Sequence, residues 1–222
     1  MKNIKQLLVI VFSLYVNITY AQQENRYVKI ESEQGSCIVK LYNETPVHRN
    51  NFIKLIKGGY FNSTTFNRIL KGFVIQGGDP DSLYGKSKKL NPEQYWIKPE
   101  FNDALFHKRG AVAMGRDDNA AKESFTTQFY IVDGKKYTND QLDAVEKKYG
   151  THIPEAQREV YRTIGGTPGL DHDYTVFGEI IKGLDIIDKI TALKVNKDGN
   201  PDKDVWMKLS VLAPEEVVKE LK

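Results

Sequence analysis

The chain of 222 residues carries 32 Lys and Arg against 29 Asp and Glu, a formal net charge of +3 at pH 7. Acidic and basic residues are interleaved, which excludes a basic patch of the kind that binds nucleic acid. Cys37 is the only cysteine, so no intramolecular disulfide can form. Stability must come from a hydrophobic core, and the chain is long enough for one domain with such a core.

Residues 1–21 have the form of a secretory signal peptide. Two lysines precede an apolar run from Leu7 to Val16, and a small-residue cleavage pattern follows at Thr19 to Ala21. The run is shorter than the roughly 20 apolar residues that a transmembrane helix needs, although an uncleaved anchor is the alternative. We expect cleavage after Ala21, no stable membrane insertion afterwards, and export to a bacterial periplasm or to the extracellular medium.

The first half of the mature chain alternates between strand and helix patterns. RYVKIESEQGSCIVKLY, residues 26–42, predicts a hairpin with its turn in the middle. Thr45-Pro46 offers an N-cap and an N1 proline for a helix of about three turns. FNRILKGFVIQGG, residues 66–78, predicts two short strands joined by Lys71-Gly72. In these two strands apolar and polar residues mix on both faces, which a half-buried strand should not show.

The second half contains more strands and a long polar connection. Asp79 to Glu100 is rich in turn residues and predicts either a functional loop or a disordered one. Gly178 indicates a bulge or a tight bend within its strand. Further strands are expected at 109–114, 125–132, 174–181 and 205–212, and a second framework helix at 183–193.

Residues 135–164 are predicted to be a helical pair inserted into the β framework. Thr138 and Gln141 form a capping-box pattern for the first helix, and Pro154 starts the second. The insert is either a surface decoration or an element that contacts a partner or gates a substrate. Residues 22–213 then form one domain, followed by a C-terminal tail at 214–222. About eight short strands and two framework helices favour a mostly β barrel with helical covers.

The sequence gives little support for nucleophilic catalysis or for a metal site. Cys37 lies in a predicted strand without a local histidine, and no serine has the pattern of a nucleophile elbow. The four histidines, including His48 and His107, are isolated and lack metal-ligand spacing. Asp171-His172-Asp173 favours a solvated turn over a metal or acid-base group. Apolar side chains, amides and one fixed cation remain, and this combination suits a peptide ligand.

Several motifs together resemble the cyclophilin-type peptidyl-prolyl isomerases. Phe66-x-Arg68-Ile69, with Gly72-Phe73 and with Gln76 to Asp79, is similar to the central signature of that family. The similarity runs from about Tyr27 to Leu212 and is interrupted by the insert. Other segments that fit, in order, are Asn51-Phe52, Gly110 to Met114, Gln128 to Ile131, Leu170-Asp171 and Val176 to Gly178.

The resemblance implies a fold, a reaction and a substrate class. The fold is an eight-stranded closed antiparallel barrel capped by two helices, which agrees with the pattern of elements. The reaction is rotation about X-Pro peptide bonds, and it needs no cofactor or metal. The partners are proline-containing segments of unfolded or folding proteins, and the oligomeric state stays open.

The resemblance also implies which residues form the site. Arg68 is the catalytic residue, because a permanently charged donor can bond the prolyl nitrogen of a twisted transition state. Phe73, Val74, Tyr130 and Leu170 form a proline pocket, Gln76 and Gln128 orient Arg68 or the substrate carbonyl, and the backbone at Gly115-Arg116 holds the residues before proline. The complete substrate-binding set is Phe73, Val74, Gln76, Gly115, Arg116, Gln128, Tyr130, Leu170 and Tyr174.

Some positions depart from the family pattern. Asn67 stands where many members have histidine, and Gly169 where the best-known members have tryptophan. A valine and a tyrosine, Val74 and Tyr130, replace the usual methionine and phenylalanine, and Tyr174 replaces a histidine. Arg116 also replaces an asparagine. The missing tryptophan makes cyclosporin sensitivity doubtful.

Three functions are compatible with the sequence. The first is an exported prolyl isomerase that assists protein folding. The second is a peptide-binding or chaperone module on the same fold with little catalysis, which the altered pocket and the insert motivate. The third is a β-barrel ligand-binding or structural domain that shares only the motifs.

Overall fold

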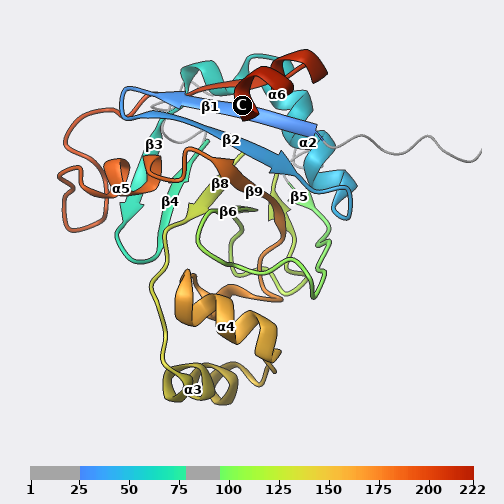
Figure 1. The fold of residues 1–222 in the computed structure, drawn as a ribbon, viewed down its shortest axis with the longest axis vertical. Helices are drawn as coiled ribbons and strands as arrows, with labels where there is room; N and C mark the ends of the chain where they lie inside the picture. The colour runs from blue at the N-terminus through green and yellow to red at the C-terminus, as the bar shows by residue number, and fades with distance from the viewer. Residues whose placement is uncertain (1–25, 79–95) are drawn as a thin grey trace, which may run out of the picture.

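A computed structural model describes residues 26–78 and 96–222, and its core is one eight-stranded antiparallel sheet (Figure 1). The predicted signal peptide and most of the predicted polar loop at 79–100 lie outside the described residues. The strands follow the order β10-β1-β2-β9-β6-β8-β4-β3 across the sheet. Their bounds are β1 Arg26–Ser32, β2 Gly35–Leu41, β3 Phe66–Leu70, β4 Val74–Gly77, β6 Ala111–Met114, β8 Phe129–Val132, β9 Val176–Lys182 and β10 Lys208–Val211.

A second sheet of two short strands was not expected. β5 (Trp96–Ile97) pairs with β7 (Ser124–Phe125) in antiparallel fashion. β7 takes up the start of the single strand predicted at 125–132, and β5 lies in the segment predicted as a loop. The helices are α2 Pro46–Lys57, α3 Asn139–Tyr149, α4 Glu155–Thr163, α5 Ile186–Thr191 and α6 Pro214–Leu221, with 3-10 turns η1 Tyr60–Ser63 and η4 Pro168–Leu170.

The prediction of a closed barrel is wrong, because the edge strands β10 and β3 do not pair with each other. The segment that precedes β10 runs beside β3 instead. The Phe66 N–H donates to the Val205 carbonyl at 2.9 Å, and the Ile69 N–H donates to the Gly199 carbonyl at 2.7 Å. This segment turns at Gly199 and Pro201, so it covers the edge without extending the ladder. The sheet is therefore a curled, open half-barrel.

The two faces of the sheet are both buried, by different groups of residues. Ile69 and Ile75 face the main core, which also contains Phe129, Phe177 and residues of α2 and α5. The opposite face carries a second cluster that includes Val74 and Tyr130. Because successive strand residues point to opposite faces, one strand contributes to both clusters. This explains why polar and apolar residues did not separate cleanly in the sequence.

Helix α2 begins at Pro46 with Thr45 at the N-cap position, as expected, but the side chain of Thr45 does not make the cap. The Thr45 side chain makes no capping hydrogen bond. Instead the Glu100 carboxylate accepts the Val47 N–H at 3.0 Å and the His48 N–H at 2.9 Å. A carboxylate at this end also complements the helix dipole. The helix is thus capped from a segment about fifty residues away.

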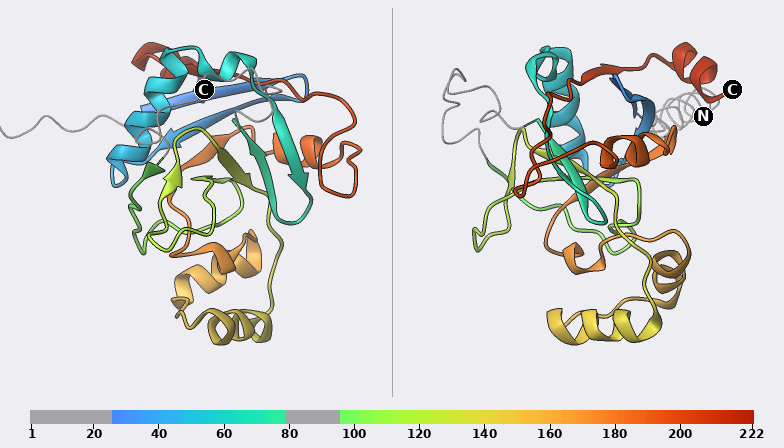
Figure 2. Two further views of the ribbon diagram at one scale, coloured as in Figure 1. Left: turned by 180° about the vertical axis from the view of Figure 1, so that it is seen from behind. Right: turned by 90° about the vertical axis from the view of Figure 1, so that its left-hand side faces the viewer.

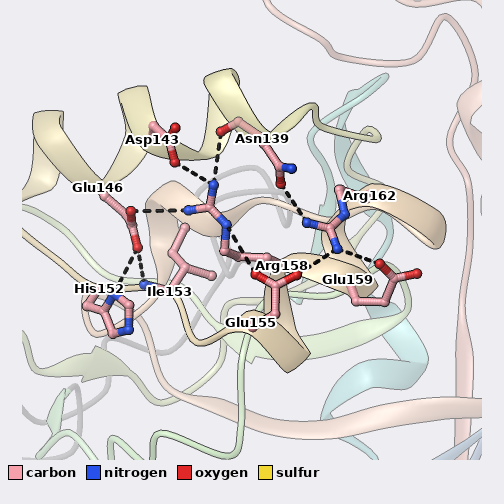
Figure 3. Close-up of polar contacts among 9 residues, drawn as sticks. All are labelled: Asn139, Asp143, Glu146, His152, Ile153, Glu155, Arg158, Glu159 and Arg162. Atoms are coloured by element: carbon pink, nitrogen blue, oxygen red, sulfur yellow. Dashed lines mark hydrogen bonds and ion pairs between the residues drawn. The ribbon is translucent and has the colours of Figure 1, made fainter.

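The predicted insert forms a separate helical layer beyond one end of the sheet (Figure 2). Thr138 and Gln141 make the predicted capping box at the start of α3. Arg158 of α4 donates to Glu146 Oε2 at 3.1 Å and also bonds Asp143 of α3, so the two helices are joined by ion pairs (Figure 3). The insert has a small core of its own, in which Leu142, Ile153 and Tyr161 are buried.

The predicted C-terminal tail contains helix α6. Its Glu220 accepts a hydrogen bond from Lys29 of β1 at 2.9 Å, and α6 lies above β1 in Figure 1. The bulge expected near Gly178 is confirmed, since the β6–β9 register skips a residue beside it. Within residues 26–78 and 96–222, no helix has the length and apolar character needed to cross a membrane.

Candidate active site

A pocket of about 130 Å³ opens on the face of the sheet that carries the second cluster. Its lining contains the catalytic residue and the nine substrate-binding residues predicted from the sequence. The tertiary structure thus brings the whole predicted set together, while the role of each residue stays a prediction. The lining residues are Arg68, Phe73, Val74, Gln76, Gly115, Arg116, Gln128, Tyr130, Leu170 and Tyr174.

Strand register aligns three of these side chains in one row. Arg68 of β3 lies opposite Gln76 of β4, and Gln76 lies opposite Tyr130 of β8. Directly opposed residues have neighbouring Cβ atoms on the same face, so a cation, an amide and an aromatic ring follow one another across the sheet. Arg68 is exposed, and among the described residues its guanidinium makes no hydrogen bond or ion pair.

A β-bulge at Asn67 decides which way Arg68 points. Phe66 pairs with Gly77 and Arg68 pairs with Gln76, so Asn67 is an extra residue without a partner. Without the bulge, Phe66 and Arg68 would share a face, since they are two residues apart. With it, Phe66 is fully buried in the main core and Arg68 reaches the pocket.

The turn between β3 and β4 presents Phe73 to the pocket. Asp133 Oδ2 accepts the Gly72 N–H at 2.7 Å, and the Phe73 carbonyl accepts the N–H groups of Asp133 and Gly134 at 3.1 and 2.9 Å. Gly72 has a φ of 75°, which suits glycine in this turn. These bonds hold the backbone of Phe73, whose side chain is 37% exposed.

Gly115 allows Gln128 to lie across the floor of the pocket. A Cβ built on Gly115 would lie 2.1 Å from Gln128 Oε1, so any side chain here would displace the amide. The Gly115 N–H donates to the Gln128 carbonyl, and the Gly115 carbonyl accepts the Phe125 N–H, both at 2.8 Å. Both backbone polar groups of Gly115 thus have partners within the protein.

Arg116 itself folds back over the site. Its guanidinium donates to the Asp173 carbonyl, pairs with the Asp173 carboxylate at 2.7 Å and lies 4.8 Å from the Tyr174 ring centre. The ion pairs with Arg116 and Lys122 hold the pKa of Asp173 below its usual range, against the effect of burial. The Arg116 side chain is thus used to fix the loop and Tyr174.

A buried hydrogen-bond chain behind the pocket was missed by the sequence analysis. The Tyr130 hydroxyl lies 2.9 Å from His107 Nε2, and His107 Nδ1 lies 2.7 Å from Asp171 Oδ1. Tyr161 of α4 donates to Asp171 Oδ2 at 2.5 Å. Burial raises the pKa of Tyr130 well above its usual value of 10, so its hydroxyl stays protonated. The chain connects the pocket to the insert.

Two interpretations from the sequence are corrected by this chain. His107 is bonded to Asp171 and Tyr130, and the turn predicted at 171–173 is present but not solvated throughout, because the Asp171 side chain is only 10% exposed and is hydrogen-bonded. His48 is likewise bonded, to Glu100 and Ser124. No local pattern could have revealed these pairs, since the partners are 23 to 76 residues apart.

Other reactive groups are not arranged for chemistry in the described part of the chain. Burial raises the pKa of the Cys37 thiol to about 12, so the thiolate is scarce at neutral pH. In residues 26–78 and 96–222 there is no group of three or more His, Cys, Asp or Glu side chains that could hold a metal ion. The arrangement of the pocket suits binding of an apolar ring beside a fixed cation.

A protein-family model described as "Cyclophilin type peptidyl-prolyl cis-trans isomerase/CLD" matches residues 27–211. The chain belongs to this family. It is therefore an isomerase of the cyclophilin type. Two curated relatives share the name "Putative peptidyl-prolyl cis-trans isomerase". The one from Staphylococcus saprophyticus is 30% identical over 177 residues, 79% of this chain and 86% of the relative. The one from Staphylococcus aureus strain USA300 is 31% identical over 192 residues, 83% of this chain and 90% of the relative.

Solved structures show the same fold for this cyclophilin-type isomerase. A cyclophilin-type isomerase of Cryptosporidium parvum, crystallised in the presence of the dipeptide Ala-Pro, superposes with a TM-score of 0.63 at 20% sequence identity. The match covers 84% of this chain and 99% of that structure. A second structure of the same parasite protein gives a TM-score of 0.62 at 22% identity.

Proposed function

We propose that this cyclophilin-type isomerase rotates X-Pro bonds in exported proteins during their folding, with Arg68 as the catalytic residue. The observation that carries the proposal is the pocket, in which an exposed Arg68 without an ion-pair partner among the described residues stands beside Gln76 and apolar side chains. The Cryptosporidium relative's crystallisation with Ala-Pro supports a proline-containing substrate here.

The reaction follows from the electronic structure of the peptide bond. Amide resonance opposes rotation with a barrier of about 18–20 kcal/mol. In the twisted transition state the prolyl nitrogen regains a lone pair, which a cationic donor bonds more strongly than it bonds the planar ground state. One charge-assisted hydrogen bond is worth about 1.5–3 kcal/mol, or about one to two powers of ten in rate. Pocket shape and positioning supply the rest.

The apolar lining serves the proline ring in this proposal. Phe73, Val74 and Leu170 offer hydrophobic surface, and the Tyr130 hydroxyl is bonded to His107. With its hydroxyl bonded there, Tyr130 offers the pocket an aromatic ring, as the phenylalanine usual at this position in the family would. Gln128 and Gln76 orient Arg68 or the substrate carbonyl, and the backbone of Arg116 receives the residue before proline.

Export rests on the sequence pattern of residues 1–21. The proposal places the mature protein, from residue 22 onward, in a periplasm or outside the cell, where folding chains with X-Pro bonds are its substrates. N-terminal sequencing of the protein from a cell-envelope fraction tests this part. A chain that still begins with Met1 would contradict cleavage.

Turnover of a short Ala-Pro peptide by the mature protein and by Arg68→Ala tests the catalytic part. The variant is expected to lose about ten- to a hundredfold in kcat/KM with an unchanged circular dichroism spectrum, because the charged donor is gone. Arg68→Lys, which keeps the charge without the planar fork, is expected to lie in between. An inactive native protein that still binds proline peptides would favour the alternative, a peptide-binding module with little catalysis.

A further inference from the structure

A second groove lies between the catalytic pocket and the helical insert. It has a volume of about 320 Å³. Helix α3 forms one wall, and the 3-10 turn Pro168–Leu170 forms the other. Its lining includes Phe73, Leu170, Lys135, Tyr137, Lys148 and Tyr149.

The groove is continuous with the catalytic pocket, because Phe73 and Leu170 line both. In the proposed function these two side chains contact the proline ring, and residues before proline lie along Arg116. If the proline of a bound peptide lies in the catalytic pocket, the residues that follow proline therefore lie in the groove.

Helix α3 presents different residues to its two sides. Asp143 and Glu146 pair with Arg158 of α4 (Figure 3). Neither carboxylate lines the groove. Residues three to four apart share a face of a helix. The side that lines the groove carries Ala144, Val145, Lys148 and Tyr149.

Two cations flank the groove without acidic partners. Lys148 Nζ lies 4.8 Å from the ring centre of Tyr149, and Lys135 Nζ lies 5.3 Å from the ring centre of Tyr137. Both lysines are exposed, and no carboxylate of the described residues pairs with either. An aromatic groove with two unpaired cations complements a peptide that carries negative charge.

Tyr149 brings aromatic surface to the junction of the groove and the pocket. A Cβ built on Gly169 would lie 3.0 to 3.1 Å from atoms of the Tyr149 ring, so glycine gives the ring its room. The Tyr149 side chain stays 49% exposed beside Leu170. Position 169 has glycine where the best-known family members have tryptophan. In this protein the ring of Tyr149, from the insert, lies against Gly169.

The α3 wall is fixed before any peptide binds. The two ends of the insert are joined by hydrogen bonds between Lys135 and Gly166, at 3.1 and 3.0 Å. Tyr161 of α4 is bonded to Asp171 behind the pocket, and Arg158 ties α4 to α3. A preformed wall lowers the entropy cost of binding an extended chain.

We propose that this groove binds the residues that follow the substrate proline and favours segments with acidic side chains there. The proposal rests on the proposed function, because the direction of the bound chain comes from it. The insert then extends the substrate site and sets sequence preference.

Two matched peptides test this proposal, one with Glu and one with Gln at the second and fourth residues after Ala-Pro. The wild-type protein is expected to show a kcat/KM about three- to tenfold higher for the Glu peptide at low salt. The Lys135→Gln/Lys148→Gln variant should bring this ratio close to one. The control variant Lys136→Gln/Lys147→Gln removes the same charge from exposed lysines outside the groove and should keep the wild-type ratio.

Equal kcat/KM values for the two peptides in the wild type would overturn the proposal. So would a preference that persists in the groove variant, or one that appears only when the Glu residues precede proline. If neither peptide is turned over, the proposed function fails, and titration calorimetry with the same peptides decides the groove separately. Tighter Glu-peptide binding that depends on Lys135 and Lys148 would support the groove, and equal Kd values would reject it.

Discussion

Single residues decide how the pocket is assembled. Arg68 reaches it because Asn67 bulges out of the β3–β4 ladder, and Gln128 crosses its floor because Gly115 has no side chain. A bulge beside a functional site commonly re-aims a side chain in this way. Asn67, as the extra residue of the bulge, therefore sets the direction of the Arg68 side chain.

Gly115→Ala is expected to lower kcat/KM for an Ala-Pro peptide by about ten- to a hundredfold, because the new methyl group would displace the Gln128 amide and so misplace its partners. Isomerisation assays measure this effect. Gly58→Ala, a substitution at the end of α2 outside the pocket, is the matched control and should keep wild-type turnover. Wild-type activity in Gly115→Ala would show that the position of Gln128 does not matter.

At the scale of elements, the insert is held together by ion pairs between its two helices as well as by its small core. Arg158 contacts Glu146, Asp143 and Glu155, and its side chain is only 12% exposed. Exposed ion pairs contribute little, whereas a mostly buried cation with several acceptors contributes more. One of the insert's connections to the rest of the domain is the hydrogen bond from Tyr161 to Asp171.

Arg158→Ala is expected to lower the free energy of unfolding of the insert by about 1–3 kcal/mol, since it leaves Asp143 and Glu146 without their shared cation. Hydrogen exchange of the α3 amides should speed up, while the β6–β8 ladder stays protected. Arg162→Ala is a graded comparison with a smaller expected effect, because the acceptors Glu155 and Glu159 are largely exposed. Unchanged exchange in α3 would contradict a clamping role for Arg158.

At the scale of the whole molecule, α2, α5 and the curled sheet pack together around one main core. Hydrogen bonds of His48 connect α2 to Glu100, which follows β5, and to Ser124 of β7. His48 Nδ1 lies 2.6 Å from Glu100 Oε2, and His48 Nε2 lies 3.0 Å from the Ser124 hydroxyl. Burial lowers the pKa of His48 below its usual 6.5, with Glu100 opposing the shift.

Stability is therefore expected to fall in mild acid. Unfolded His48 takes up a proton near pH 6.5, whereas folded His48 stays neutral to lower pH, so the unfolded state binds more protons. The free energy of unfolding should decrease as pH falls below about 6.5, by at most about 1.4 kcal/mol per pH unit for this group. Urea denaturation at several pH values measures the slope, which His48→Gln should reduce. Equal slopes in the two proteins would assign the acid sensitivity to other groups.

The sequence by itself determined most of the elements and predicted which residues line the pocket. The hairpin at 26–42, the Thr138 capping box and the helix after Pro46 depend on neighbours in the chain, so local patterns reveal them. The ten pocket residues followed from motifs whose order and spacing resemble one family.

Only the tertiary structure decided how the sheet ends, which way Arg68 points and what lies behind the pocket. The open sheet, the Glu100 cap and the chain from Tyr130 through His107 and Asp171 all join residues far apart in sequence. Hydrogen bonds between such residues form only where the folded backbone brings donor and acceptor together, and no local period encodes that meeting.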